Sequence, residues 1–174
     1  MLDLTDINNR LRKWREKRNI IMFHQKKGLL ANITEEITEY LRADNNHDKI
    51  NALCDISIYI LNSFVINEVE KREIEVFPYN FFMSIYTSKL ATKSSCELLI
   101  GYIIAEFETL QYKYIPCMHE TITEIESRVG HYDDKLKKWV KETQYENVYI
   151  PNYERFANKK GKNHKKIIAS EKKD

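Results

Sequence analysis

Hydrophobic residues recur at helical spacing on both sides of a short polar break in the first third of the chain. Before the break, they fall on one arc of a helix: Leu29, Leu30, Ile33, Ile37, Tyr40 and Leu41. After it, residues 50–65 are apolar around most of a helix, except for one polar stripe made of Asp48, Asn51, Asp55, Tyr59 and Asn62. The break itself reads Ala-Asp-Asn-Asn-His at 43–47. The pattern predicts two helices joined by a short turn.

Acidic side chains of these two helices can meet across a shared groove. Glu36 lies at the edge of the apolar arc and Glu39 follows three residues later, so the two are neighbours, whereas Glu35 points nearly the opposite way. Asp55 lies on the polar stripe of the second helix. Converging carboxylate oxygens are the ligands of a hard cation such as Mg²⁺. The stripe reads equally well as a solvated face, and only the pairing of the two helices favours the groove.

The sequence EEITE followed by ALCDISIYILN resembles the MazG-like all-α nucleoside triphosphate pyrophosphohydrolases, particularly the small single-domain forms of phages and bacteria. These enzymes pair an EExxE helix with an ExxD helix, bind Mg²⁺ through the acids, and hydrolyse a nucleoside triphosphate to the monophosphate and pyrophosphate. Residues 35–39 match the first motif in full. The second is half matched, because Asp55 is present but Ala52 stands at the glutamate position. Residues 14–20 and 120–141 also resemble the family.

The resemblance implies roles for particular residues. The catalytic set is Glu35, Glu36, Glu39 and Asp55, with Glu35 supporting the metal ligands or orienting water. The implied cofactor is Mg²⁺, with Mn²⁺ as a substitute, held by Glu36, Glu39 and Asp55 together with Asn51 or Asp48. The implied substrate-binding residues are Tyr59, Asn62, Arg128, Lys138, Lys141 and Trp14.

Simpler interpretations stand beside several of these roles. Trp14 is first of all a core residue, and the lysines around 137–141 also fit the solvated face of a short helix. Glu120, Glu124 and Arg128 are spaced at i, i+4 and i+8, which is typical of a row of surface ion pairs.

Further helices are predicted along the rest of the chain. One covers Thr5 to Arg18; another opens with a Ser94–Glu97 capping box and reaches about Gln111; a third starts near Pro116 and stops at Gly130. Residues 19–27 are expected to be a connection, where Arg18, Asn19 and Gln25 either reach a pocket or make turn hydrogen bonds. Residues 68–76 are expected to continue the second acidic helix. For the aromatic part of the irregular segment 68–93, the sequence leaves three interpretations open: a loop packed against the core, a lid, or a subunit contact.

These elements predict an all-α fold, a bundle of two antiparallel helix pairs around an acidic cleft. The helix at 94–111 carries more apolar surface than one exposed helix uses, so self-association into a dimer or tetramer is expected. Residues 1–157 would form the domain. Residues 158–174 hold seven lysines against Glu171 and Asp174 and are expected to be a disordered tail.

Composition removes several classes of function. The four glycines are isolated, so no P-loop or dinucleotide-binding fingerprint is present. Three cysteines without a CxxC pair predict buried free thiols rather than disulfides or a zinc site. No run of 18 apolar residues and no signal-peptide core occur, so we expect a cytoplasmic protein without a membrane partner. No Glu-x-x-His pair supports a ferritin-like di-iron bundle.

The sequence thus predicts Mg²⁺-dependent hydrolysis of a (deoxy)nucleoside triphosphate to its monophosphate and pyrophosphate. One alternative is a relative with impaired catalysis that binds nucleotide as a regulator, because Ala52 replaces a ligand. The other is a helical interaction protein that uses its basic tail, although nucleic acid is not the expected partner.

Overall fold

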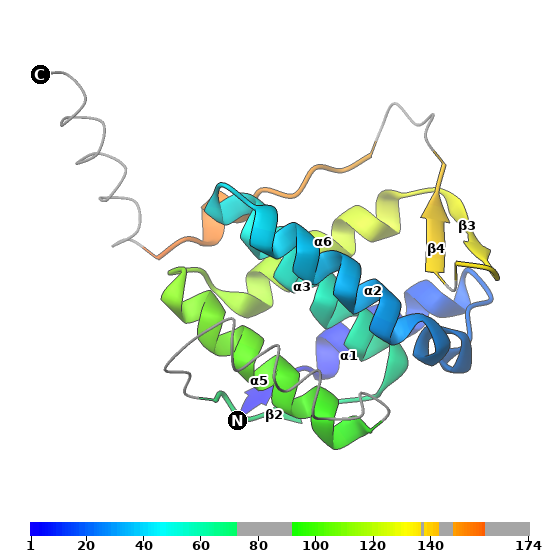
Figure 1. The fold of residues 1–174 in the computed structure, drawn as a ribbon, viewed down its shortest axis with the longest axis horizontal. Coiled ribbons are helices and arrows are strands. Elements are labelled where there is room, and N and C mark those ends of the chain that lie inside the picture. Colours follow the sequence, from blue (N-terminus) through cyan, green and yellow to red (C-terminus); the bar gives the residue numbers. More distant parts are fainter. Residues whose placement is uncertain (73–91, 137, 143–147, 159–174) are drawn as a thin grey trace, which may run out of the picture.

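The computed structural model describes residues 1–72, 92–136, 138–142 and 148–158 (Figure 1). The helices in these ranges are α1 (Thr5–Glu16), α2 (Met22–Arg42), α3 (Asn46–Ser63), α5 (Lys93–Thr109) and α6 (Tyr114–Ser127), with a short 3₁₀ helix at Tyr153–Phe156. The strands form two small antiparallel pairs, β1 (Leu2–Asp3) with β2 (Glu68–Val69) and β3 (Gly130–Asp133) with β4 (Lys138–Lys141). The predicted mainly helical fold is confirmed, and the two small sheets were not predicted.

The antiparallel pair of α2 and α3 forms the centre of the molecule (Figure 1). The turn between them is capped by Asn45, whose side-chain oxygen accepts a hydrogen bond from the backbone N–H of Asp48 at 3.0 Å. α3 also packs against α1, α5 and α6. Its apolar residues are therefore buried on nearly every side, which explains why the sequence of α3 is hydrophobic around most of its circumference.

The predicted connection at residues 19–27 is wrong, because α2 already begins at Met22. The turn before it is made by Asn19, which adopts a positive φ of 54°. Asparagine tolerates this left-handed backbone better than most residues. No proline or glycine lies between this turn and Gly28, so nothing prevents the helix from starting early.

The predicted extension of α3 beyond Asn67 is also wrong. The helix ends at Ser63 and Phe64 is already extended. From there the chain runs as an extended segment, and Leu4 donates its N–H to the carbonyl oxygen of Asn67 at 2.7 Å. β2 follows and pairs with β1. Most of the predicted irregular aromatic segment, residues 73–91, and nearly all of the lysine-rich tail, residues 159–174, lie outside the described residues.

α5 confirms the predicted helix but not its predicted capping box, because the N-cap is Thr92, which accepts from the N–H of Ser95. The apolar face of α5 is buried, apart from the partly exposed Leu110 at its end. Gly101 lies so close to the segment after β2 that an added Cβ would be 2.6 Å from the carbonyl oxygen of Glu70. The surface from which a dimer interface was predicted is thus covered within one chain.

α6 has Pro116 in its first turn, as predicted, but ends at Ser127 rather than at Gly130. Gly130 instead opens β3, where an added Cβ would collide with the carbonyl oxygen of Val140. The lysines predicted on a short helix at 137–141 belong to or flank strand β4. Its central residues, aromatic Trp139 and β-branched Val140, are of the types enriched in strands, which explains the difference.

The three cysteines, Cys54, Cys96 and Cys117, are buried thiols, as predicted. Burial raises the pKa of each thiol, to about 12 for Cys96 and Cys117. They are therefore protonated core residues. No helix within the described ranges is long and apolar enough to cross a membrane.

Candidate functional site

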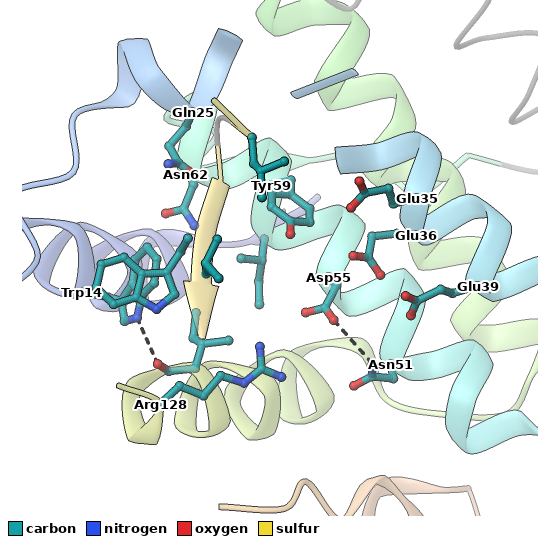
Figure 2. A pocket seen from close by; sticks show the side chains of 15 residues that line it. Trp14, Gln25, Glu35, Glu36, Glu39, Asn51, Asp55, Tyr59, Asn62 and Arg128 are labelled. Atoms are coloured by element: carbon teal, nitrogen blue, oxygen red, sulfur yellow. Dashed lines mark hydrogen bonds between the residues drawn. The ribbon is translucent and has the colours of Figure 1, made fainter. Parts of the chain in front are cut away.

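A cavity of about 400 Å³ lies between α2, α3, the end of α6 and the β3–β4 hairpin (Figure 2). One end is acidic and amide-bearing, with Glu35, Glu36, Glu39, Asn51 and Asp55. The other end is made of aromatic and amide side chains, namely Trp14, Gln25, Asn62 and Trp139. Tyr59 lies between the two ends along α3, and Arg128 reaches the cavity from the end of α6.

The predicted acids of α2 and α3 line this one cavity. Figure 2 shows the carboxylates of Glu36 and Asp55 turned toward the same space, with Glu39 beside them. Glu36 is buried, with 8% of its surface exposed, although it is the charged residue at the edge of an apolar arc. Glu35, which was expected to point away, is exposed but also lines the cavity. The cavity is wide enough to receive side chains from more than one face of α2.

Asp55 is held by a chain of hydrogen bonds that begins at Tyr153, in the segment 148–158. Asn51, one turn before Asp55 on α3, donates its side-chain N–H to the carboxylate of Asp55 at 3.4 Å. The side-chain oxygen of Asn51 accepts from the hydroxyl of Tyr153 at 2.9 Å, and that hydroxyl also contacts Thr121 of α6 at 2.8 Å. Asn51 therefore orients Asp55, and its own oxygen is already engaged.

Two pKa shifts show how the charges converge. The pKa of Tyr59 is raised, first by burial and then by the negative charges of Asp55, Glu36 and Glu35. Burial alone would lower the pKa of Arg128, but the hydrogen bond and charge of Glu124, with a smaller effect of Asp55, raise it overall. The carboxylates of the acidic end thus act together on the hydroxyl of Tyr59, and Arg128 remains a cation at their border.

Three of the predicted site residues lie elsewhere or are only partly described. Asp48 is exposed at the start of α3, where its carboxylate accepts from the side chain of Asn45 at 2.7 Å. It does not line the cavity, because the N-cap geometry turns it toward the α2–α3 turn. Lys138 and Lys141 form the ends of β4, and their side chains lie outside what the structure describes.

Glu120, Glu124 and Arg128 do not form the expected exposed row. The side chains of Glu124 and Arg128 are paired and only 13% and 21% exposed. Glu120 is buried and accepts hydrogen bonds from the hydroxyl of Tyr149 at 2.6 Å and the N–H of Asn152 at 3.0 Å. It fastens the last described segment to α6, because that segment passes over this face of the helix.

The opposite end of the cavity has an aromatic wall. Trp14 is buried, donates its indole N–H to the carbonyl oxygen of Ile125 at 3.1 Å, and meets Trp139 edge to face at 5.8 Å between ring centroids. The guanidinium of Arg18 lies over both rings and donates to carbonyl groups at the end of α6. Of the three residues near the start of α2 that were considered for a pocket, Gln25 is the one that lines it.

The hairpin wall of the cavity, Leu136, Trp139 and Val140, was not predicted as part of the site. The adjacent aromatic and β-branched residues Trp139 and Val140 are typical of strands, but a four-residue strand is hard to tell from the edge of a helix by sequence alone. The sequence therefore predicted the acidic groove, but it did not predict that the hairpin closes the cavity beside Trp14.

The chemistry of the donors suits Mg²⁺, since hard carboxylate oxygens surround a cavity with four acids and one arginine. Nevertheless, within the described residues no group of three or more His, Cys, Asp or Glu side chains is arranged to hold a metal ion. Coordination would therefore require these carboxylates to move closer together on a cation. The side chains of Glu36 and Glu39 on α2 and of Asp55 on α3 can change rotamer to make such a movement.

Comparison with known proteins gives no match: no family model, no curated protein and no solved structure is significantly similar to this chain.

Proposed function

We propose that the protein is a MazG-like, Mg²⁺-dependent hydrolase that converts a (deoxy)nucleoside triphosphate to its monophosphate and pyrophosphate. The observation that carries the proposal is the shared cavity: Glu36 and Glu39 from α2 and Asp55 from α3 line one end of it, and a buried aromatic and amide wall lines the other. The two ends of a nucleoside triphosphate match the two ends of this cavity, because its metal-bound phosphates lie at one end and its planar base at the other.

In this proposal Glu36, Glu39 and Asp55 hold the cation. When bound, Mg²⁺ would neutralise phosphate oxygens and lower the pKa of the attacking water. Glu35, exposed at the mouth of the cavity, orients that water or supports the ligands. Asn51 keeps the carboxylate of Asp55 in place through its 3.4 Å hydrogen bond.

Arg128 supports the proposal from the border of the acidic end. Its guanidinium is anchored by Glu124, so it is held in one direction and stays protonated. A guanidinium presents several N–H donors to phosphate oxygens. We assign Arg128 to the triphosphate, with Lys138 and Lys141 as further candidates, and Tyr59 to the nucleoside side of the acids.

The experiment is a pyrophosphate-release assay with a panel of ribo- and deoxyribonucleoside triphosphates, with Mg²⁺, with Mn²⁺ and with chelator. Metal-dependent release of pyrophosphate together with the monophosphate supports the proposal. Release of inorganic phosphate and a diphosphate, or no turnover of any member, contradicts it.

A regulatory nucleotide-binding protein is the second candidate, and one observation favours it. Ala52, at the position of the missing glutamate, is 1% exposed and part of the core, so α3 brings a single acid to the cavity. Tight nucleotide binding without pyrophosphate release would identify this function.

We also propose that the active form is a homo-oligomer, a dimer or a tetramer. The support comes from α2 rather than α5: Phe23, Leu30 and Leu41 are more than half exposed. Their separations of seven and eleven residues place them on one stripe of the helix. An apolar stripe along a central helix is the kind of surface that a second copy buries.

A further inference from the structure

The two ends of the cavity offer different chemistry to a ligand. Acids gather around Asp55, whereas Gln25 of α2 and Asn62 of α3 lie together at the other end beside Trp14 (Figure 2). Seven residues of helix separate Asp55 from Asn62, which corresponds to about 10 Å along α3. The amide end is therefore placed to receive a different part of the ligand from the part that meets the acids.

The amide of Asn62 has a fixed orientation. Asn62 is 2% exposed, and its side-chain oxygen accepts a hydrogen bond of 2.7 Å from the guanidinium of Arg15, itself 6% exposed. A guanidinium only donates hydrogen bonds, so the atom of Asn62 that faces it must be the oxygen. Arg15 is not one of the residues that line the cavity, whereas Asn62 is. The oxygen is thus directed away from the cavity, and the NH₂ group is the end left to face it.

Gln25 provides a second donor at the same place. It is 5% exposed and lines the cavity, and its side-chain nitrogen has no hydrogen-bond partner among the described residues. A buried N–H without an acceptor costs free energy, which is recovered when a ligand supplies the acceptor. The amide end therefore presents N–H donors from two helices, next to an aromatic wall.

On the premise of the proposed nucleotide hydrolysis, we infer that this end is a base subsite that selects a ring with a carbonyl group over one with an amino group, and that Arg15 sets this choice by holding the amide of Asn62. The accepted class is the 4-oxo pyrimidines and 6-oxo purines. Their carbonyl oxygen accepts from Gln25 and Asn62, and their planar ring lies against the Trp14 wall.

An amino base meets the opposite situation. Its NH₂ group would face the fixed NH₂ group of Asn62, and these two buried groups would stay unpaired. Asn62 could relieve this only by turning its amide, which would leave the guanidinium of Arg15 against an NH₂ group. Arg15 is thus a positioning residue: it acts on the ligand through Asn62 without touching it.

The first test uses nucleosides without phosphates, so that binding needs neither metal nor turnover. Calorimetry of the full chain with deoxyuridine against deoxycytidine, and with inosine against adenosine, should give at least roughly tenfold tighter binding of the oxo member of one pair. Equal affinities within both pairs, tighter binding of the amino members, or no binding of any nucleoside overturns the inference.

The variants test the role of Arg15 directly. Asn62→Asp keeps a partner for Arg15 but replaces the N–H donor by a carboxylate oxygen, so the preference should shift toward the amino nucleoside. Arg15→Met releases the amide and should reduce the preference to near equality. An unchanged preference in folded Asn62→Asp overturns the inference, and this variant decides alone if Arg15→Met fails to fold.

Asn32 offers a matched control on α2. It is 1% exposed, its NH₂ group also has no partner among the described residues, and it does not line the cavity. Asn32→Asp should leave the preference unchanged; if it shifts the preference as Asn62→Asp does, the effect is general and the inference fails.

The pyrophosphate assay separates the two proposals. An oxo preference without pyrophosphate release contradicts the hydrolase alone, and equal release and binding for all bases contradict the subsite alone.

Discussion

At the scale of single residues, the site is defined by which acids share the cavity and which do not. Glu36, Glu39 and Asp55 meet there, while Asp48, on the same polar stripe of α3, is turned to the α2–α3 turn. The stripe is thus divided between a cavity-lining part and a capping part. The sequence alone could not divide it, because both parts have the same helical spacing.

Glu39→Gln and Asp55→Asn should each lower pyrophosphate release by at least about 100-fold, since even groups that only support metal ligands are worth 10–100-fold. Circular dichroism and the melting temperature should be unchanged or slightly higher, because repulsion among the acids is relieved. Asp48→Asn is the matched control and should keep its activity. Loss of helical signal in the first two variants would mean that these acids are structural.

Glu106 gives the molecule a pH-dependent stability of its own. It is buried on α5, and burial raises the pKa of its carboxyl above the ordinary value of 4.5, although the hydrogen bond from Tyr40 and the charge of Lys49 act in the other direction. The folded state therefore holds this proton more tightly than the unfolded state. The stabilisation is complete below the unfolded pKa and is lost as the pH rises through the folded pKa.

Glu106→Gln mimics the protonated form and still accepts from Tyr40. In urea unfolding, the variant should match the wild type below pH 4.5 and be more stable at neutral pH. Parallel stability curves for Glu106→Gln and the wild type would contradict this account.

At the scale of elements, periodicity predicted the long helices and missed the short strands. α1, α3, α5 and α6 begin within a few residues of their predicted starts, because their apolar faces repeat over several turns. The pairs β1–β2 and β3–β4 are only two and four residues long, and each strand depends on a partner distant in the chain or on a tight turn. The acids could be predicted as a set; the hairpin wall and the amide end could not, because tertiary packing brings them there.

Gly130 is the residue on which the hairpin wall depends. Gly130→Ala places a Cβ against the carbonyl oxygen of Val140 and the indole nitrogen of Trp139. We expect a loss of about 1–3 kcal/mol in unfolding free energy and a change in tryptophan fluorescence as Trp139 moves from Trp14. Val129→Ala, at a neighbouring exposed position, should change neither. Unaltered fluorescence and stability in Gly130→Ala would show that the hairpin can shift without cost.

At the scale of the whole molecule, one chain already buries the face of α5 from which association was predicted. The exposed stripe of α2 is the remaining apolar surface on the central helix pair. If the protein self-associates, the exposed stripe of α2 is therefore the surface to test. The same helix carries three of the four cavity acids. Association there would hold the acidic helix in place.

Light scattering should give the mass of a dimer or tetramer, and Leu30→Lys should shift it to that of a monomer, because a buried lysine costs more than the leucine contributes. Ile150→Lys, at a position that is 80% exposed and not part of α2, is the control and should leave the mass unchanged. A monomeric wild type, or a Leu30→Lys protein that keeps its mass, would contradict the proposal.

The reactivity of the three buried thiols reports transient opening of the protein core. Cys54, Cys96 and Cys117 are all inaccessible and protonated in the folded state, so an alkylating reagent can react only when the surrounding helices separate. Cys54 lies on α3, the helix that also carries Asp55 and Asn62. The rate of alkylation of Cys54 therefore reports how often the helices around α3 separate. A ligand that fills the cavity should lower this rate without contacting a cysteine.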